Sequence, residues 1–458
     1  MIRLTSAEIL ALLNRREAGW ARAAENMPAW SATGVSTDSR SVRPGELFVP
    51  LVGERFDGHE YIEAAMTAGA AGVLSSRANL PYAARIDVPD TRAALQRLAG
   101  SYRERFSPVA VALTGSAGKT TTKELTAAVF AARYRTMKTA GNLNNDIGVP
   151  LTLLRLTAEH EAAVVELGMS HAGEIAVLTR LARPDIALIT NIGTSHIGNL
   201  GSQENICRAK LEILEGLRPG GAVVLNGDDP YLSAAEIPER FRSVFFAVDN
   251  PRAAVRAADL RFAEEGSRFD ILWDGRRFPA ELRLAGRHNV YNALAAFAAG
   301  VCGGVPPERA AAALVGVEPE GMRQRVVEKN GCTVIEDCYN ANPDSMRAAL
   351  QVLRNYAGRR RFALLGDMLE LGAYAAEAHA EIGAEAARCA DALVAVGDFA
   401  ADTARGAQEN GMAAANVLTP PRREAAACLR GLLRDGDVLL VKGSRGMKME
   451  EILREIFS

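Results

Sequence analysis

"ALTGSAGKTTTKE", Ala112 to Glu124, is the stretch that decides how this chain folds. The apolar run Val109 to Leu113 predicts a buried strand, and the residues from Thr120 onward predict a helix that ends near Phe130. The loop between them lies at a helix N-terminus, where free backbone N–H groups and the positive end of the helix dipole attract anions. The stretch therefore predicts a phosphate site between a strand and a helix.

The side chains of this loop favour a nucleotide phosphate as the anion. Lys119 supplies a point charge and Thr120 a hydroxyl for Mg²⁺. The usual P-loop glycine five residues before Gly118 is absent, since that position is Leu113, and a shorter motif that starts at Gly115 remains. A glycine turn with a solvated lysine is the alternative interpretation, and the loop alone does not name a reaction. We expect nucleotide contacts from Gly115, Ser116, Gly118, Lys119, Thr120 and Thr121.

Composition and charge limit the classes of protein that this chain can represent. Its 458 residues correspond to about three domains of roughly 150 residues each. A content of 48% hydrophobic and 24% charged residues is ordinary for a globular protein. The net charge of −2 gives no electrostatic case for binding nucleic acid or an anionic membrane. The six cysteines are scattered without a Cys-x-x-Cys pair, which indicates free thiols in a reducing compartment.

No segment of the sequence reads as an export signal or a membrane span. Ile2 to Leu13 contains Arg3 and Glu8, unlike a signal peptide. The longest uncharged stretch, Asn289 to Pro307, contains glycines and prolines, so we reject it as a membrane span. We therefore expect a cytoplasmic protein, and we take it to be a monomer.

Strand-like runs such as "AAVVELG", "DIALITNIG", "RFALLGD" and "DVLLVKG" alternate with helical runs. This alternation favours α/β domains with largely parallel sheets. Boundaries near Ser107-Pro108 and Glu318-Pro319 give three expected domains, residues 1–107, 108–318 and 319–458. Ligands of open α/β sheets collect beyond the carboxyl ends of the strands, so residues that follow strands become candidates for the site.

Two candidates follow strands of the expected central domain. Glu166 ends the apolar run "AAVVE", and His196 follows "DIALITNIG" by three residues. An acidic residue at a strand end near a phosphate loop is a natural Mg²⁺ ligand, because a hard cation prefers carboxylate oxygen and bridges phosphates. The alternatives are a helix-capping or surface glutamate and a structural histidine.

Lys210 falls on the apolar face of a predicted helix. In "ENICRAKLEILEGL" it lies four residues from both Ile206 and Leu214. An ammonium group there must find a partner, extend to water or lose its charge, because burying an unpaired cation is costly. Reaction with CO₂ would convert the amine into a carbamate able to hold a metal ion. A pair with Glu166, or a stem that extends to water, is the alternative.

Two segments of the expected C-terminal domain carry further polar candidates. In "CYNANPDSM", Asn342 can cap a helix that starts at Pro343, which leaves Asn340 and Asn342 in a loop beyond a strand end. In "VKGSRGMKME", Lys442 and Arg445 lie where a strand meets a helix, and both suit a substrate carboxylate. Simple exposure of the two cations is the alternative.

The order of these motifs carries a resemblance to a known family. The quoted segments, with "GNLNNDIGVPLTLL", "GRHNVYNALAA", "MRQRV" and "LLGDMLELG", occur in the order expected of the Mur ligases of peptidoglycan synthesis. The resemblance implies an N-terminal α/β domain for the UDP end of a substrate, a central P-loop ATPase-type domain with a parallel sheet, and a Rossmann-like C-terminal domain. The reaction that it implies is ATP-dependent amide formation through an acyl phosphate.

The block "STDSRSVRPGELFVPL" and the segment "KGSRGMKME" make the chain look like the family member that joins D-alanyl-D-alanine to UDP-N-acetylmuramoyl-tripeptide (UDP-MurNAc-tripeptide). The nearest alternative is the member that adds a diamino acid to UDP-MurNAc-dipeptide. Its "DNPR" motif occurs here as Asp249 to Arg252, in the central domain, where we interpret it as a turn. An alternative of another class is a nucleotide-dependent switch or binding protein, which leaves the N-terminal block and Lys210 without a purpose.

Carried over by position, the resemblance implies a role for each candidate of the central domain. Lys119 would hold the β- and γ-phosphates of ATP, and Thr120 with Glu166 would bind a first Mg²⁺. His196 with carbamylated Lys210 would bind a second Mg²⁺ near the acyl phosphate. The implied catalytic residues are Lys119, Glu166, His196 and Lys210.

The resemblance also implies contacts to the substrates. Asn292 and Asn289 would contact the adenine, Arg323 the nucleotide phosphates and Asp337 the ribose. A helix start, a solvated arginine and a strand-end aspartate are the respective alternatives. Contacts to the UDP-linked peptide and D-Ala-D-Ala are implied for Ser39, Arg40, Asn142, Asn145, Asn340, Asn342, Lys442 and Arg445.

Overall fold

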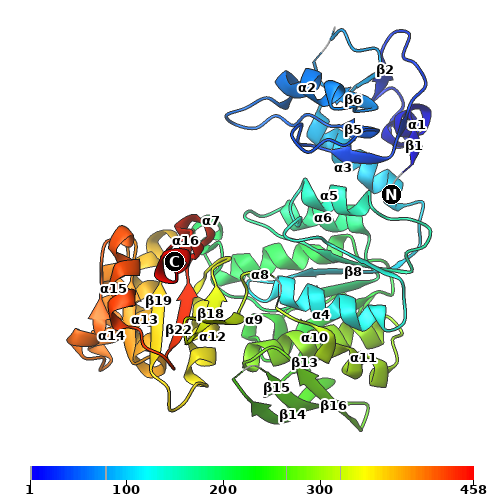
Figure 1. The fold of residues 1–458 in the computed structure, drawn as a ribbon. Coiled ribbons are helices and arrows are strands. Elements are labelled where there is room, and N and C mark those ends of the chain that lie inside the picture. The colour runs from blue at the N-terminus through cyan, green and yellow to red at the C-terminus, as the bar shows by residue number, and fades with distance from the viewer. Residues whose placement is uncertain (1–2, 78–79, 265, 320) are drawn as a thin grey trace.

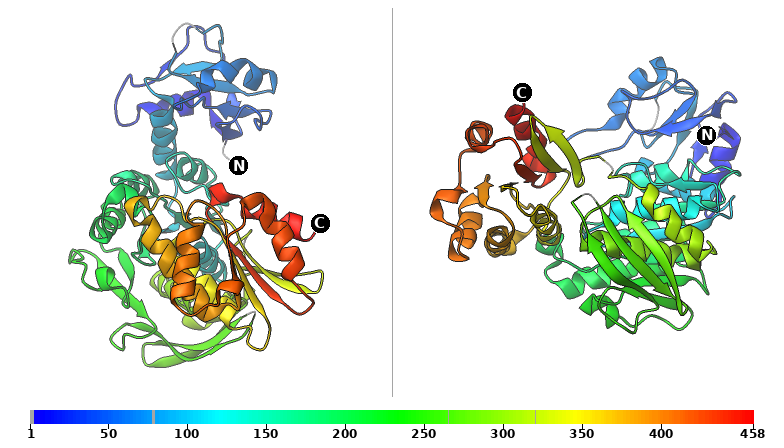
Figure 2. Two further views of the ribbon diagram at one scale, coloured as in Figure 1. Left: turned by 90° about the vertical axis from the view of Figure 1, so that its left-hand side faces the viewer. Right: turned by 60° about the horizontal axis from the view of Figure 1, so that its bottom comes forward.

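The structure is a computed structural model that describes residues 3–77, 80–264, 266–319 and 321–458. Its main sheets follow one another along the chain, and helices pack on each of them (Figure 1). The N-terminal and C-terminal parts lie on different sides of the central part (Figures 1 and 2). The expected α/β class with three parts is therefore confirmed, while boundaries near residues 107 and 318 stay predictions.

The N-terminal part is a small α/β unit. Its elements are β1 (Leu4–Thr5), α1 (Ser6–Asn14), β2 (Arg22–Ala23), β3 (Ser31–Ala32), β4 (Gly34–Ser36), β5 (Glu46–Phe48), α2 (Ile62–Thr67), β6 (Gly72–Ser75), β7 (Arg85–Asp87) and α3 (Thr91–Arg103). The main sheet has the order β2-β7-β6-β5-β4, and β1 pairs with β3. Helix α3 leads into the central part and buries Leu95 and Leu98.

The central part carries the phosphate loop. Its elements are β8 (Val109–Thr114), α4 (Lys119–Ala131), β9 (Thr136–Lys138), α5 (Gly148–Leu153), β10 (Ala162–Glu166), α6 (Glu174–Ala182), β11 (Ile186–Ile189), α7 (Ile197–Leu200), α8 (Gln203–Leu211), β12 (Ala222–Asn226), α9 (Pro230–Ser233), β13 (Arg242–Ala247), β14 (Val255–Phe262), β15 (Ser267–Trp273), β16 (Arg276–Leu282), α10 (Arg287–Cys302) and α11 (Pro307–Ala313). Strand β8 and helix α4 confirm the predicted strand and helix on either side of the loop.

The strand order of the central sheet places this loop at a crevice. The order is β16-β15-β14-β13-β12-β11-β8-β10-β9, and the pairs from β9 to β14 are parallel. After β8 the chain passes to β9 and β10 on one side and then returns to β11 on the other. Connections that diverge in this way open a crevice at the carboxyl end of the strand, where open α/β sheets bind ligands.

The C-terminal part forms a second parallel-rich sheet. Its elements are β17 (Arg325–Lys329), β18 (Cys332–Asp337), α12 (Pro343–Arg354), β19 (Arg361–Leu365), α13 (Ala375–Cys389), β20 (Ala392–Ala395), α14 (Ala400–Glu409), β21 (Val417–Leu418), α15 (Ala425–Leu432), β22 (Val438–Lys442) and α16 (Met449–Ile456). The order is β17-β18-β22-β19-β20-β21, and only β17 pairs antiparallel among these strands. Strands β18 and β22 end side by side, with Asp337 opposite Lys442.

One further expectation from the sequence, a turn at the "DNPR" segment, is met. The "DNPR" segment lies between β13 and β14, and its last two residues form a turn. Across residues 3–77, 80–264, 266–319 and 321–458, no helix combines the length and the apolar composition that crossing a membrane requires.

Candidate active site

Two glycines fix the shape of the phosphate loop. Gly118 adopts φ +78°, and a Cβ atom there would lie 2.5 Å from Asn292 Oδ1. A Cβ atom at Gly115 would lie 1.8 Å from Thr190 Oγ1. Any larger residue would therefore push the loop away from β11 or from α10.

The Lys119 side chain folds back onto this loop. Its Nζ donates to the carbonyl oxygen of Gly115 at 2.7 Å and reaches that of Ser116 at 3.5 Å. Burial lowers the pKa of Lys119, the nearby Glu166 carboxylate opposes this effect, and the Arg323 guanidinium adds to it. The cations of Lys119 and Arg323 thus outnumber the Glu166 anion at the loop. A bound polyphosphate would supply the negative charge that balances them.

Glu166 has the environment of a cation ligand. It ends β10, its side chain is buried, and its Oε1 accepts from Thr120 Oγ1 at 3.4 Å. Its other carboxylate oxygen, Oε2, is buried without a hydrogen-bond partner in the described structure. A buried carboxylate oxygen with no donor is costly unless a cation or donor meets it, so Glu166 and Thr120 fit a Mg²⁺ ion.

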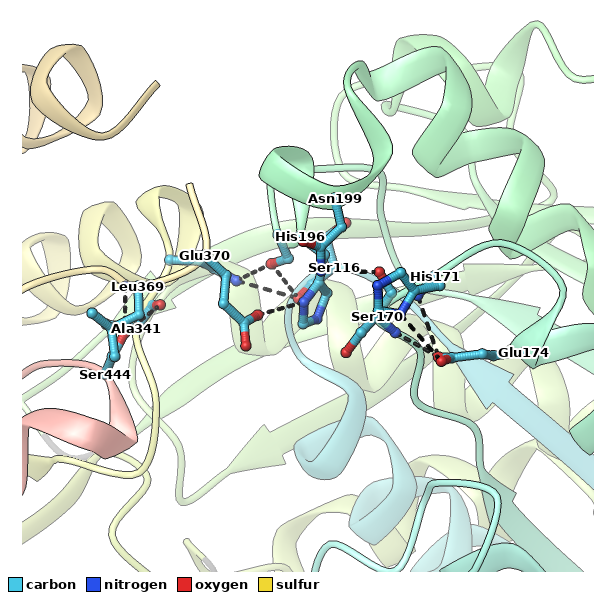
Figure 3. Close-up of polar contacts among 12 residues, drawn as sticks. Ser116, Ser170, His171, Glu174, His196, Asn199, Ala341, Leu369, Glu370 and Ser444 are labelled. Carbon is cyan, nitrogen blue, oxygen red and sulfur yellow. Dashed lines mark hydrogen bonds and ion pairs between the residues drawn. The ribbon is translucent and has the colours of Figure 1, made fainter. Parts of the chain in front are cut away.

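His196 lies at the start of α7, in a left-handed conformation with φ +63°. Its Nδ1 lies 2.6 Å from Oε2 of Glu370, which belongs to the C-terminal part (Figure 3). Burial lowers the pKa of His196, Glu370 opposes this, and the cations Lys119 and Lys210 lower it further. The histidine therefore feels the charges of both predicted catalytic lysines.

Lys210 is buried on α8, as its position on the apolar face predicts. Burial lowers the pKa of Lys210 well below its ordinary value, and the Lys119 ammonium adds to the effect. The part of the chain that the structure describes supplies no hydrogen bond or ion pair to its Nζ. The alternative pair with Glu166 is therefore wrong, and Lys210 remains a buried amine that is short of a counter-charge.

Within the described ranges, no cluster of three or more His, Cys, Asp or Glu side chains could hold a metal ion. The predicted cation ligands are of a different composition, because each pair combines one such residue with a hydroxyl or a modified lysine. Thr120 with Glu166, and His196 with Lys210, therefore stay predictions.

The predicted adenine ligands lie on α10 against the phosphate loop. Asn292 accepts from Thr122 Oγ1 at 3.1 Å and donates to Asn289 Oδ1 at 3.1 Å. Asn289 in turn donates to Gln324 Oε1 at 3.0 Å. Both asparagines are buried, so this chain of amides orients the wall of the crevice next to Gly118.

The C-terminal part contributes a second group of charged residues. The Arg323 guanidinium lies 3.9 Å from the ring centroid of Tyr339. The Lys442 Nζ donates to Asp337 Oδ2 at 2.6 Å and to the carbonyl oxygen of Asn340 at 3.1 Å. The sequence prediction assigned Lys442 and Asp337 to two different ligands, whereas in the fold the two side chains form a buried ion pair.

A cavity of about 900 Å³ joins these groups. Residues from all three parts line it, including Arg92 of α3, the phosphate loop and the loop after β18. The predicted residues that line it are Ser116, Gly118, Lys119, Thr120, Thr121, Asn142, Asn145, Glu166, His196, Asn289, Asn292, Arg323, Asp337, Asn340, Asn342 and Lys442. Those that the structure places outside its lining are Ser39, Arg40, Gly115, Lys210 and Arg445.

Asn342 connects the C-terminal part to the phosphate loop. It caps α12 by accepting from Ser345 N at 2.8 Å, which confirms the predicted cap before Pro343. Its Nδ2 also donates to Ser195 Oγ at 2.5 Å and reaches the Ser116 carbonyl oxygen at 3.3 Å. The N-terminus of α12 is therefore held directly over the phosphate loop.

Sequence reasoning missed several polar residues of the site. Asn191 Oδ1 accepts from the backbone N–H groups of Ser116 and Ala117 at 3.1 and 2.9 Å. Asn144 Nδ2 donates to Glu166 Oε1 at 2.8 Å. Asn191 of "TNIGTSH" comes shortly after the apolar run Ile186 to Ile189, and that position was the available signal. Asn144 lies in the asparagine-rich segment "GNLNND", which no apolar run precedes.

The buried pair of Lys442 and the exposed pair of Arg445 predict losses of stability of different size. Lys442→Met leaves the Asp337 carboxylate buried without its partner, and we expect a loss of about 3 kcal/mol in the free energy of unfolding. Arg445→Met removes an exposed pair with Glu450, so the expected loss is below about 1 kcal/mol. Urea unfolding of both variants, followed by circular dichroism, measures the difference. Equal losses would mean that the buried pair does not stabilise the C-terminal part.

Known proteins match this chain closely. The UDP-N-acetylmuramoyl-tripeptide--D-alanyl-D-alanine ligase of Bacillus subtilis is 41% identical over 92% of this chain and 93% of its own. The crystal structure of MurF from Acinetobacter baumannii superposes with a TM-score of 0.88, at 33% identity, over 98% of both chains. The structure of MurF from Thermotoga maritima in complex with ADP has a TM-score of 0.79, at 27% identity, over 92% of this chain and 96% of that one.

The fold and the site define a nucleotide-binding α/β enzyme whose phosphate loop is covered by a second α/β unit. Three family models match the chain in order. They are "Mur ligase family, catalytic domain" over residues 31–103, "Mur ligase middle domain" over residues 113–300 and "Mur ligase, glutamate ligase domain" over residues 322–445. The chain belongs to the Mur ligase family, and it is an ATP-dependent ligase.

Proposed function

We propose that this protein joins the carboxylate of UDP-MurNAc-tripeptide to the amine of D-Ala-D-Ala, with ATP converted to ADP and phosphate. The observation that carries the proposal is the cavity that holds the phosphate loop and Glu166 under a lid of C-terminal residues. It is large enough for reacting groups of two substrates beside a nucleotide. The names of the relatives support the choice of UDP-MurNAc-tripeptide and D-Ala-D-Ala as the two substrates.

In the first half of the reaction, a carboxylate oxygen of the tripeptide attacks the γ-phosphorus of ATP. A bond forms between that oxygen and phosphorus, the bond to the β–γ bridging oxygen breaks, and ADP leaves. Two anions must meet, so cations at the loop are required. Lys119 and Arg323, which both line the cavity, supply fixed positive charge there.

In the second half, the amine of D-Ala-D-Ala attacks the acyl carbon. The carbon–nitrogen bond forms, the bond between carbon and the phosphate oxygen breaks, and phosphate leaves with the electron pair, while the nitrogen loses a proton. The loop after β18 carries Asn340 and Asn342 at the cavity wall, where their amides suit a peptide substrate. The position of α12 over the phosphate loop brings this wall to the nucleotide side.

Thr120 and Glu166 would hold one Mg²⁺, and His196 with a carbamate on Lys210 would hold a second. These ions neutralise charge on phosphate and acyl phosphate when they are bound. The unpartnered Oε2 of Glu166 supports the first assignment. The second assignment is supported by Lys210, a buried amine beside Lys119 that lacks an anionic partner in the described residues.

Ser39 and Arg40 would contact the UDP group at a distance from the chemistry. Both lie in the N-terminal part and outside the lining of the cavity, and Arg40 is an exposed residue held by Asp38 at 2.7 Å. A long UDP-linked peptide suits this separation, because its two ends need different parts of the protein. We also propose that the protein acts in the cytoplasm as a monomer.

Phosphate release from ATP tests the function. We expect release that requires both UDP-MurNAc-tripeptide and D-Ala-D-Ala. UDP-MurNAc-dipeptide with meso-diaminopimelate or lysine is the matched control and should give background release. Release with the dipeptide and a diamino acid alone would identify the neighbouring ligase instead. Release without either peptide substrate would favour a nucleotide-dependent switch.

A further inference from the structure

The C-terminal part reaches the catalytic histidine through one short segment. Glu370 follows β19, and its Oε2 lies 2.6 Å from His196 Nδ1 of the central part. The backbone N–H of Gly198 donates to the Glu370 carbonyl oxygen at 3.3 Å, and the Tyr374 hydroxyl donates to the Gly201 carbonyl oxygen at 3.2 Å. Figure 3 shows Glu370 and His196 facing each other across this contact.

Two glycines allow the segments to approach at backbone distance. A Cβ atom at Gly198 would lie 2.9 Å from the Glu370 carbonyl oxygen and 3.1 Å from Gly372 N. A Cβ atom at Gly372 would lie 3.2 Å from Gly198 Cα. A side chain at Gly198 would therefore meet backbone, which cannot rotate away as a flexible side chain can.

Both partners of the contact have unusual backbones. His196 has φ +63° and Glu370 has φ +65°, and neither is a glycine. Non-glycine residues in this region cost on the order of 1 kcal/mol or more and persist where their surroundings fix them, often at functional sites. Neighbouring hydrogen bonds fix the Glu370 segment. Leu369 N donates to Ser444 Oγ at 2.9 Å (Figure 3), and Met368 N donates to His379 Nε2 at 2.9 Å.

The contact with Glu370 indicates which ring nitrogen of His196 carries the proton. Among the residues that the structure describes, the Glu370 carboxylate is the group that faces His196 Nδ1. The two atoms form a close ion-pair contact at 2.6 Å that is not an aligned hydrogen bond, and no other described group hydrogen-bonds to Nδ1. A carboxylate at Nδ1 favours the tautomer with its proton on Nδ1, which leaves the lone pair on Nε2. Carboxylates that support a histidine in this way orient its ring for a ligand on the other nitrogen.

We propose that Glu370 is a positioning residue that sets the orientation and tautomer of His196 when the C-terminal part docks through the Gly198–Gly372 contact. The C-terminal part, which brings the loop after β18 to the cavity, would thereby also fix the His196 ring for its ligand. This inference rests on the proposed function for the catalytic role of His196, whereas the effect on the ring itself does not depend on it.

The first test is the tautomer of His196 in protein labelled with ¹⁵N-histidine, measured by NMR without substrates. We expect the Nδ1–H form in the native protein and a mixture of tautomers in Glu370→Ala. Glu370→Gln, which keeps an acceptor oxygen, should recover the native tautomer in part. Glu377→Gln, at an exposed position of α13, is the matched control and should leave the spectrum unchanged.

The second test separates docking from the carboxylate itself. Gly198→Ala should increase the radius of gyration measured by small-angle X-ray scattering and produce the same mixture of tautomers, although Glu370 is intact. In the ligase assay, Glu370→Ala should lower kcat by about 10- to 100-fold and raise the Mg²⁺ concentration needed for half-maximal rate. The KM for ATP should stay near the native value, since the phosphate loop is untouched.

A native tautomer in both Glu370→Ala and Gly198→Ala would overturn the inference. An unchanged Mg²⁺ requirement and kcat in Glu370→Ala would also overturn it, because a residue that positions His196 for catalysis must affect the rate when it is removed. If the native protein lacks turnover dependent on D-Ala-D-Ala, the proposed function fails, while the NMR and scattering results still decide whether Glu370 orients His196.

Discussion

Replacing Lys119 by alanine is expected to lower ATP turnover by about 10²- to 10³-fold while the chain stays folded. The ammonium is held at the loop backbone, with its Nζ 2.7 Å from the Gly115 carbonyl oxygen. Its loss removes the charge that would offset repulsion between the γ-phosphate and the attacking carboxylate. Among the described residues, its side chain hydrogen-bonds only to its own loop, so the unfolding transition should change little.

Two variants sharpen the test of Lys119. Lys119→Arg keeps the charge but replaces a compact ammonium with a planar guanidinium, and we expect it to remain impaired. Lys138→Ala, an exposed lysine on β9, is the control and should be fully active. Phosphate release and circular dichroism should be recorded on the same samples. Near-native turnover by folded Lys119→Ala would remove the phosphate loop from the mechanism.

Local sequence signals were sufficient to predict the phosphate loop and the helices around it. The apolar run before Gly115 and the Gly-Lys-Thr segment gave the strand, the loop and the helix, because each depends on neighbouring residues only. The burial of Lys210 followed from helical periodicity in the same way. The cap at Asn342 depends on Pro343 and Ser345, which lie within one turn of it.

Contacts between distant segments could not be predicted in this way. Lys442 and Asp337 are separated by a long stretch of chain and meet only because β18 and β22 are neighbours in the sheet. The sequence indicated two polar strand ends, but it gave no register to pair them. Glu370 was part of a quoted motif without a role, since its partner His196 belongs to another part of the protein.

Lys210→Ala is expected to be inactive, with activity restored by added short carboxylic acids. The amine is buried, its pKa is lowered by burial and by Lys119, and a neutral amine is the form that reacts with CO₂. In that reaction the nitrogen bonds to the carbon of CO₂ and loses a proton, which leaves a carbamate. Alanine removes this group and opens space in which acetate or propionate can supply a carboxylate. Phosphate release as a function of acid concentration measures the rescue.

Three controls separate the carbamate from packing. Lys210→Met fills the same space without an amine and should stay inactive at every acid concentration. Arg208→Ala, on the exposed side of α8, should be active and insensitive to the acids. With ¹³CO₂, the native protein should show a carbamate signal by ¹³C NMR that Lys210→Ala lacks. Full activity of Lys210→Ala without added acid would exclude the carbamate, because the reaction would then proceed without any group at that position.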